Sequence, residues 1–172
     1  MPRPVKEYIS LQKGILCLTN YDIDALHFIK MARAGLAHSN NGEFLQAHNA
    51  FQTAISLWHG AMPEDTFRSE RVLSINDTLA GLLTKTCSTW AKNLAEAGRL
   101  DDAITILERI LLRNSLDETL TILLYSFYCL NNNHLQAREI LERYRKALVK
   151  AEYTAQQAAS FIEQIIASTA SD

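Results

Sequence analysis

The histidines are the first residues that could support chemistry, and their spacing does not favour a metal centre. His27 and His38 are 11 residues apart, as are His48 and His59, and 11 residues is close to three helical turns. Each pair could therefore share one face of a helix. A metal site, however, needs ligands at i and i+4 or converging carboxylates, and the sequence has no His-Glu-x-x-His motif. The histidines therefore do not predict a metal site.

The cysteines point to a reducing environment. Cys17, Cys87 and Cys129 are odd in number and too far apart for a disulfide framework or a zinc knuckle. We expect reduced thiols in a cytoplasmic protein, with Cys87 and Cys129 as small core residues. The first residues lack the apolar segment of a signal peptide, and no run approaches the ~20 apolar residues of a membrane helix. The sequence thus predicts a cytoplasmic protein with no membrane partner.

Catalytic and nucleotide-binding motifs are absent. The chain has no GxSxG elbow, no Walker loop and no GxGxxG turn. Glu64-Asp65 and Asp101-Asp102 are acidic pairs, but Asp101-Asp102 opens a predicted helix, where negative charge faces the positive end of the helix dipole. We therefore interpret that pair as helix-stabilising charge and expect neither an enzyme nor a bound cofactor.

The composition indicates a folded domain with little overall attraction for nucleic acid. The chain has 172 residues, of which 48% are hydrophobic, with six glycines and three prolines. This composition fits one domain with a buried core. A net charge of −2 argues against a chain-wide electrostatic hold on nucleic acid, although a local basic patch stays open.

Charges between residues 138 and 150 allow two interpretations. Glu139 with Arg143, and Glu142 with Lys146, have i, i+4 spacing with the acid first, which stabilises an exposed helix face. We favour such a solvated face. The remaining cations and a tryptophan at a helix end form a candidate interaction surface: Trp58, Arg138, Arg145 and Lys150. Its cations could contact nucleic-acid phosphates if a DNA-binding domain docked nearby.

Helical periodicity dominates the chain after residue 20, and short polar breaks separate the apolar runs. The breaks before Ala47, Ala103 and Ala137 resemble one another. From Ala103 to Ala137 is 34 positions, the tetratricopeptide period, and from Ala47 to Ala103 is 56, or 34 plus 22. The sequence therefore predicts an all-α fold of about three antiparallel helix pairs, with an insertion near residues 60–81. A capping box at Thr154 and Gln157 begins a C-terminal helix.

The repeat pattern assigns small residues to close helix crossings and large residues to the gaps between helices. We expect Gly35 at the closest crossing of the first pair. The assigned structural positions are Gly35, Ala47, Phe51, Ala54, Trp90, Ala91, Ala103, Leu107, Tyr128, Ala137 and Leu141.

The N-terminal residues have a different pattern. Residues 8–12 and 15–18 flank Lys13-Gly14 and predict a short β-hairpin. An isolated hairpin is marginally stable in water, so we expect it to pack on, or belong to, another domain. Its open strand edge also predicts a weak homodimer.

Three segments in order carry a family resemblance. They are residues 14–18 followed by Tyr21-Asp-Ile-Asp24, residues 54–60, and residues 98–104 followed by 115–118. Together they resemble the bacterial transcriptional activator domain, the tetratricopeptide-like module that follows a winged-helix DNA-binding domain in SARP-type and large multidomain regulators. The resemblance covers about residues 14 to 150, and Ser115 departs from it where the family usually has proline.

The resemblance implies a domain organisation and a function. Residues 1–19 would be a remnant hairpin of an upstream winged helix, and residues 20–172 the tetratricopeptide-like domain. DNA would be read only through that missing upstream domain. The implied partners are proteins: a second copy, the adjoining winged helix, or the transcription machinery. The alternative is a stand-alone peptide-binding adaptor or chaperone, which would not need the hairpin and would prefer a groove lined with Lys, Arg and Asn.

Overall fold

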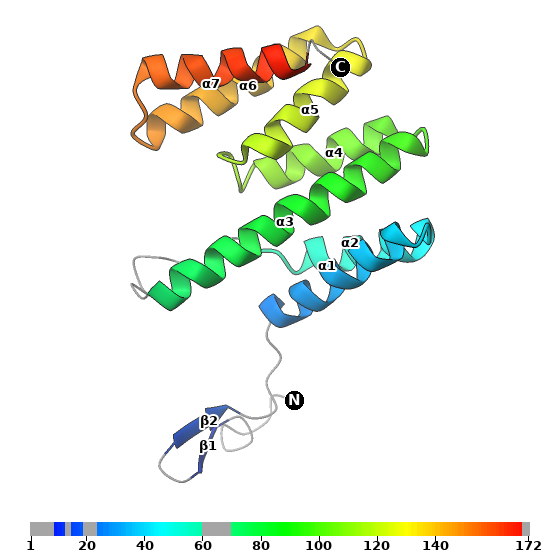
Figure 1. Ribbon diagram of the computed structural model, residues 1–172, viewed down its shortest axis with the longest axis vertical. Coiled ribbons are helices and arrows are strands. Elements are labelled where there is room, and N and C mark those ends of the chain that lie inside the picture. The colour runs from blue at the N-terminus through cyan, green and yellow to red at the C-terminus, as the bar shows by residue number, and fades with distance from the viewer. Residues whose placement is uncertain (1–8, 13–14, 19–23, 60–69, 170–172) are drawn as a thin grey trace, which may run out of the picture.

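Seven helices follow one another in the described part of the chain (Figure 1). The computed structural model describes residues 9–12, 15–18, 24–59 and 70–169. The helices are α1 (Asp24–Asn40), α2 (Phe44–Ser56), α3 (Glu70–Glu96), α4 (Leu100–Leu111), α5 (Glu118–Leu130), α6 (His134–Lys150) and α7 (Ala155–Thr169). The predicted all-helical repeat fold is therefore confirmed for the described residues from 24 onward.

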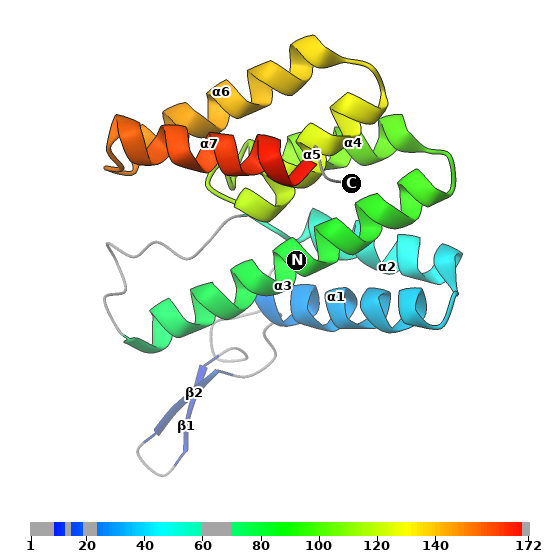
Figure 2. The same cartoon turned by 45° about the horizontal axis from the view of Figure 1, so that its top comes forward.

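The helices stack as successive antiparallel pairs (Figures 1 and 2). α1 packs on α2, α3 on α4, and α5 on α6, while α7 covers α6 and part of α5. α3 joins the pairs, because it contacts α1, α2, α4 and α5. One core of buried side chains runs through the first two pairs and into α5 and α6, and a second, smaller core lies between α6 and α7.

The small residues of the repeat pattern lie at close helix crossings. Gly35 is buried, and a Cβ added there would lie 2.5 Å from Cδ1 of Phe51. The ring of Phe51 thus occupies the space that any larger side chain on α1 would need. The other assigned positions are all buried: Ala47, Phe51, Ala54, Trp90, Ala91, Ala103, Leu107, Tyr128, Ala137 and Leu141.

The turns inside the three pairs share one backbone conformation. Gly42, Gly98 and Asn132 occupy equivalent positions and have φ of 75°, 74° and 55°. Glycine, and asparagine next to it, adopt this left-handed region at least cost. The next N–H in each turn donates to the carbonyl five residues earlier: Glu43 to His38 at 2.9 Å, Arg99 to Leu94 at 2.8 Å, and Asn133 to Tyr128 at 2.8 Å. These bonds end each first helix and explain why the polar breaks repeat.

Helix α3 accounts for part of the predicted insertion. It has 27 residues, against 17 in α1 and 13 in α5, the first helices of the other pairs. Its additional N-terminal turns extend past α1 (Figure 1). The insertion predicted at residues 60–81 thus partly lengthens this helix, and residues 60–69 lie outside the described residues.

Side chains accept hydrogen bonds from backbone N–H groups at the start of each of the last three helices. Asp117 accepts a hydrogen bond from the Leu120 N–H at 3.0 Å at the start of α5. Thr154 and Gln157 form the predicted capping box: the Thr154 N–H donates to Gln157 Oε1 at 2.9 Å, and the Gln157 N–H donates to Thr154 Oγ1 at 3.2 Å. Such caps satisfy backbone donors that have no partner inside the helix.

Two short strands precede the helices. β1 (Ile9–Gln12) pairs antiparallel with β2 (Ile15–Leu18), with Ile9 opposite Leu18 and Gln12 opposite Ile15. Among the described elements, neither strand contacts a helix, so each strand has one edge without a partner.

Replacing Gly35 with leucine tests the close crossing of the first pair. Because the Phe51 ring fills this space, we expect Gly35→Leu to lower the free energy of unfolding by about 1–3 kcal/mol in urea titrations. Gly81 is the matched control, because nothing lies within 4 Å of a Cβ added there. Gly81→Leu should raise stability by about 0.5–1 kcal/mol through helix propensity. Equal midpoints for the two variants would contradict the proposed crossing.

Tyr144 makes stability sensitive to alkaline pH. Burial, and then the charge of Glu118, raise the pKa of Tyr144 from 10.0 to about 12. The unfolded chain therefore ionises at lower pH than the folded chain, and this contribution to stability, complete below pH 10, is lost as pH rises towards 12. The free energy of unfolding of Tyr144→Phe, measured by circular dichroism, should fall less steeply with pH over this window than that of the unchanged protein. An unchanged pH profile would exclude Tyr144 as a cause.

Candidate interaction groove

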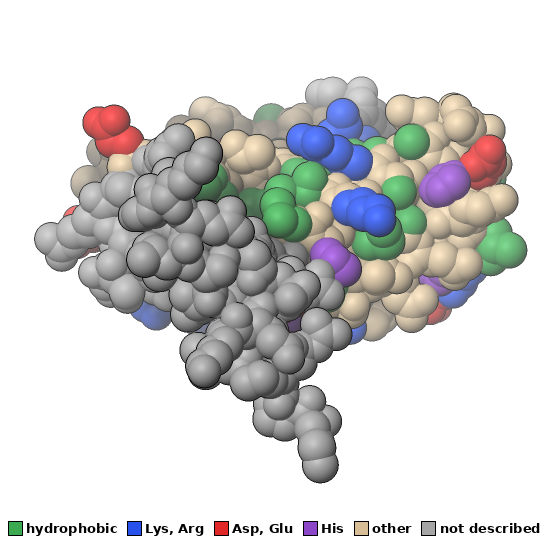
Figure 3. Space-filling view, turned by 90° about the horizontal axis from the view of Figure 1, so that it is seen from below, with side chains coloured by type: hydrophobic (Ala, Val, Ile, Leu, Met, Phe, Trp, Pro, Cys, Tyr) green, Lys and Arg blue, Asp and Glu red, His purple; other side chains and the backbone are tan. Residues whose placement is uncertain are grey.

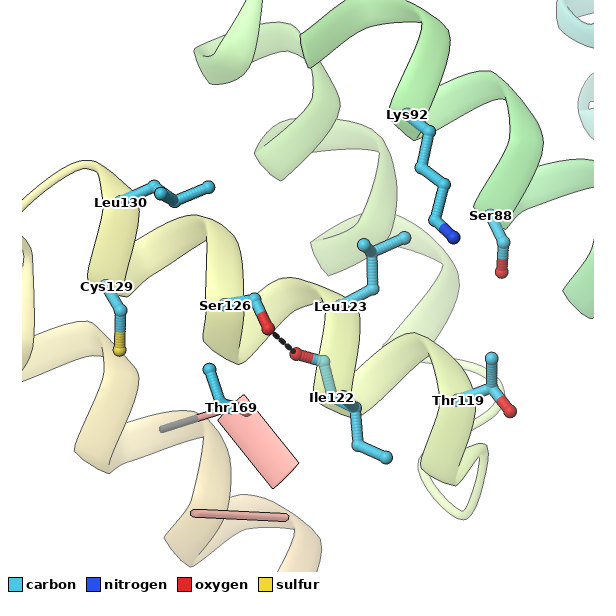
Figure 4. A pocket seen from close by; sticks show the side chains of 9 residues that line it. All are labelled: Ser88, Lys92, Thr119, Ile122, Leu123, Ser126, Cys129, Leu130 and Thr169. Atoms are coloured by element: carbon cyan, nitrogen blue, oxygen red, sulfur yellow. Dashed lines mark hydrogen bonds between the residues drawn. The ribbon is translucent and has the colours of Figure 1, made fainter. Parts of the chain in front are cut away.

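A groove of about 660 Å³ lies between α3, α5 and the end of α7 (Figure 4). We call it the inner groove. Its lining residues are Ser88 and Lys92 from α3, Thr119, Ile122, Leu123, Ser126, Cys129 and Leu130 from α5, and Thr169 from α7.

Helical spacing gathers these side chains on single faces. Ser88 and Lys92 are four residues apart on α3, and Thr119, Ser126 and Leu130 follow at intervals close to whole turns on α5. The opposite face of α5 is buried in the core through Leu120 and Leu124. The packing of α5 therefore fixes which side chains face the groove.

The groove has an apolar floor with polar groups around it. Ile122 and Leu123 contribute apolar side chains from α5 (Figure 4), and Leu130 is 70% exposed. Ser126 is already bonded, because its hydroxyl donates to the Ile122 carbonyl at 2.9 Å. Lys92 is the one charged residue in the described lining. These features suit an apolar segment of another protein better than a highly charged ligand.

Hydrogen bonds join α3, which lines the groove, to neighbouring helices. The Thr84 hydroxyl on α3 donates to Asp117 Oδ2, and Asp117 also caps α5. Asn93 of α3 donates to Ser39 of α1 at 2.8 Å. The Thr84–Asp117 bond therefore joins α3 to the start of α5 beside the groove, and the Asn93–Ser39 bond joins α3 to the first pair.

Trp58 does not belong to an exposed interaction surface, contrary to the sequence-based prediction. Its side chain is 6% exposed, and its ring lies 5.3 Å from the Phe28 ring, centroid to centroid. Arg113 donates to the Trp58 carbonyl at 3.0 Å. The segment after α2 folds back over the start of α1, and sequence position alone did not reveal this contact.

Arg145 is not an unpaired cation, which corrects a second prediction. It makes two hydrogen bonds to Glu142, each of 2.8 Å, and the hydrogen bonds from Arg145 lower the pKa of Glu142. Lys146 lies 3.8 Å from the same carboxylate. Arg138 and Lys150 are exposed on α6, and neither lines the inner groove. The four predicted surface residues thus do not form one patch.

Sequence reasoning missed the residues of the inner groove. Ser88, Thr119 and Ser126 have no composition signal, because serine and threonine are common on exposed helix faces. A usable signal was their offset from two equivalent positions of the repeat. Ser88 lies three residues before the buried Ala91, and Ile122 lies three before the half-buried Tyr125. The groove positions can therefore be located from the repeat alignment, but not from any single residue type.

The histidines and cysteines do not gather into a metal-binding group in the described part of the chain. No group of three or more His, Cys, Asp or Glu side chains there could hold a metal ion. His48 accepts a hydrogen bond from Trp90, and His38 contacts Glu43. Burial raises the pKa of the Cys87 thiol well above its usual range, which disfavours the reactive thiolate. None of the described helices is long and apolar enough to cross a membrane.

The fold and the groove define the class of this chain as an all-helical repeat protein. Its sequence then gives the family. A sequence model of the bacterial transcriptional activator domain matches residues 23–158, which is most of the chain. The chain therefore belongs to the bacterial transcriptional activator domain family, and the resemblance found in its motifs is confirmed.

The fold is similar to that of a solved structure. Mycobacterium tuberculosis EmbR, in complex with a low affinity phosphopeptide, superposes with a TM-score of 0.59 at 20% sequence identity. The match covers 95% of this chain and 44% of the EmbR chain, so this chain spans less than half the length of that protein. A comparison with curated protein sequences found no match.

Proposed function

We propose that this chain is the regulatory and protein-interaction module of a bacterial transcription factor in the cytoplasm, with no catalytic activity of its own. Membership of the bacterial transcriptional activator domain family carries this proposal. The inner groove supplies the surface, because an apolar floor with one cation suits a segment of a partner protein.

DNA reading is assigned to a winged-helix domain of the same protein. The similarity to EmbR covers less than half of that longer protein, so a module of this kind can work beside other domains. The β1–β2 hairpin is then the last hairpin of the winged helix, and residues 20–172 are the regulatory domain. The partners are a second copy, the winged helix or the transcription machinery, and no membrane surface is involved.

The composition of the groove weighs against the alternative of a stand-alone adaptor or chaperone. Such a protein would hold a peptide carboxylate with several Lys, Arg and Asn side chains. The described lining of the inner groove has Lys92 and otherwise hydroxyl, thiol and apolar groups. The family match also favours a transcription regulator.

A charge in the inner groove should uncouple activation from DNA binding. Leu130→Glu in the full-length regulator places a carboxylate where the partner's apolar surface would lie. Because burying an unpaired charge is costly, we expect activated transcription from the target promoter to fall about tenfold or more. A gel shift should show unchanged promoter affinity.

Leu135→Glu is the matched control for that experiment. Leu135 is similarly exposed, at 67%, but lies at the start of α6 and does not line the groove. It should leave activation unchanged. Equal losses from both variants, or full activity of Leu130→Glu, would contradict a partner in the inner groove.

The hairpin should support a weak dimer of this chain. Each of its strands has an edge without a partner in the described sheet, and such edges recruit further strands. Sedimentation of the chain with and without residues 1–19 should show a concentration-dependent dimer for the longer form alone. Two monomeric forms, or two equal dimers, would exclude the hairpin as the interface.

A further inference from the structure

A second surface hollow runs between α2, α3 and α4, and we call it the α2–α4 cleft. It consists of two adjoining hollows of about 370 Å³ and 250 Å³, which share His48, Trp90, Leu94 and Arg99. One end carries Phe44 and Leu45 from the start of α2. The other end carries Gln52 from α2 and the following residues of α4: Asp102, Thr105, Ile106 and Arg109.

The α2–α4 cleft is separate from the inner groove. The two share no lining residue. On α3, Ser88 and Lys92 face the groove, whereas Trp90 and Leu94 line the cleft. Two residues correspond to about 200° around an α-helix, so α3 presents nearly opposite faces to the two sites. A ligand in one leaves the other open.

The cleft has a free cation at one end. Arg99 and Asp102 satisfy each other, with Arg99 Nε 2.7 Å from Asp102 Oδ2. Arg109 is exposed, and in the described part of the chain it makes no ion pair or side-chain hydrogen bond. Its guanidinium presents several donors suited to a carboxylate. The described lining of the cleft therefore has a net charge of +1 with His48 neutral.

A hydrogen bond in the wall of the cleft fixes the tautomer of His48. The Trp90 Nε1–H donates to His48 Nδ1 at 3.0 Å, and the two rings meet edge to face with centroids 5.4 Å apart. Because Nδ1 accepts this bond, the proton of the neutral ring is on Nε2. The Trp90 indole N–H is thus part of the wall and reports directly on occupancy of the cleft.

The opposite end of the cleft is apolar and open to solvent. Phe44 is 56% exposed and Leu45 is 72% exposed, although large apolar side chains on adjacent positions are usually covered. A ligand that covers them must supply apolar surface of its own. Nucleic acid offers little of it and would need several cations along its phosphates, whereas a peptide can supply both an apolar side chain and a carboxylate.

We propose that the α2–α4 cleft binds an acidic peptide segment of a partner protein. An apolar side chain of the peptide covers Phe44 and Leu45, and a carboxylate binds Arg109. The Arg99–Asp102 pair separates these two contacts and excludes a second carboxylate at the centre, because Asp102 would repel it. The module then has two independent docking sites, one on each side of α3.

Nuclear magnetic resonance of the ¹⁵N-labelled chain tests this proposal. The protein has two tryptophans, so its indole region contains the Trp90 signal and, as an internal reference, that of Trp58, which does not line the cleft. The probes are a short synthetic peptide that alternates pairs of leucine and glutamate, the same peptide with glutamine for glutamate, and a short DNA duplex. We expect only the glutamate peptide to move the Trp90 signal.

Two arginine variants make the test specific. Arg109→Gln should weaken the glutamate peptide about threefold to tenfold, as loss of an exposed charge pair does. Arg33→Gln on α1, an exposed arginine outside the cleft, should bind as the unchanged protein does. The proposal is wrong if the Trp90 signal does not move, or if it responds to DNA alone. It is also wrong if the glutamine peptide binds as well as the glutamate peptide, or if Arg109→Gln binds as tightly as the unchanged protein.

Discussion

The close approach of α1 and α2 at Gly35 is the constraint on which the rest of the stack depends. The Phe51 ring lies where a Cβ at Gly35 would be placed, so any larger residue on α1 forces the ring or the two helices to shift. Buried alanines serve the same purpose in the next pairs, with Ala91 and Ala103 in the second and Ala137 in the third. Each pair leaves one apolar face for its neighbour to cover, and α7 covers the last.

Helix α3 converts this stacking into two functional faces. It contacts four other helices, and its hydrogen bonds reach α1 through Asn93, α2 through Trp90 and α5 through Thr84. Because these contacts fix its rotation, Lys92 must face the inner groove and Leu94 the α2–α4 cleft.

The repeat architecture was predictable from sequence, because the 34-residue spacing of Ala103 and Ala137 records a geometric requirement. The same holds for Gly35, because a Cβ there would meet the Phe51 ring. The sequence does not determine two other contacts: the burial of Trp58 against Phe28 and the pairing of Arg145 with Glu142. The first depends on how the chain leaves α2, and the second on a choice between i, i+3 and i, i+4 partners that differ little in energy. The groove residues escaped notice because each is an ordinary exposed residue until the pairs stack.

The central claim is that a partner protein occupies the inner groove when the regulator acts. Cys129 lines that groove and is half-buried (Figure 4), whereas Cys87 is fully buried and will react slowly. Figure 3 shows the stack from the α1 end. The direct measurement is the rate of Cys129 alkylation by iodoacetamide in the full-length regulator carrying Cys17→Ser, first alone and then assembled with promoter DNA and RNA polymerase. The account predicts that assembly slows alkylation severalfold, and an unchanged rate in the assembled complex would contradict it.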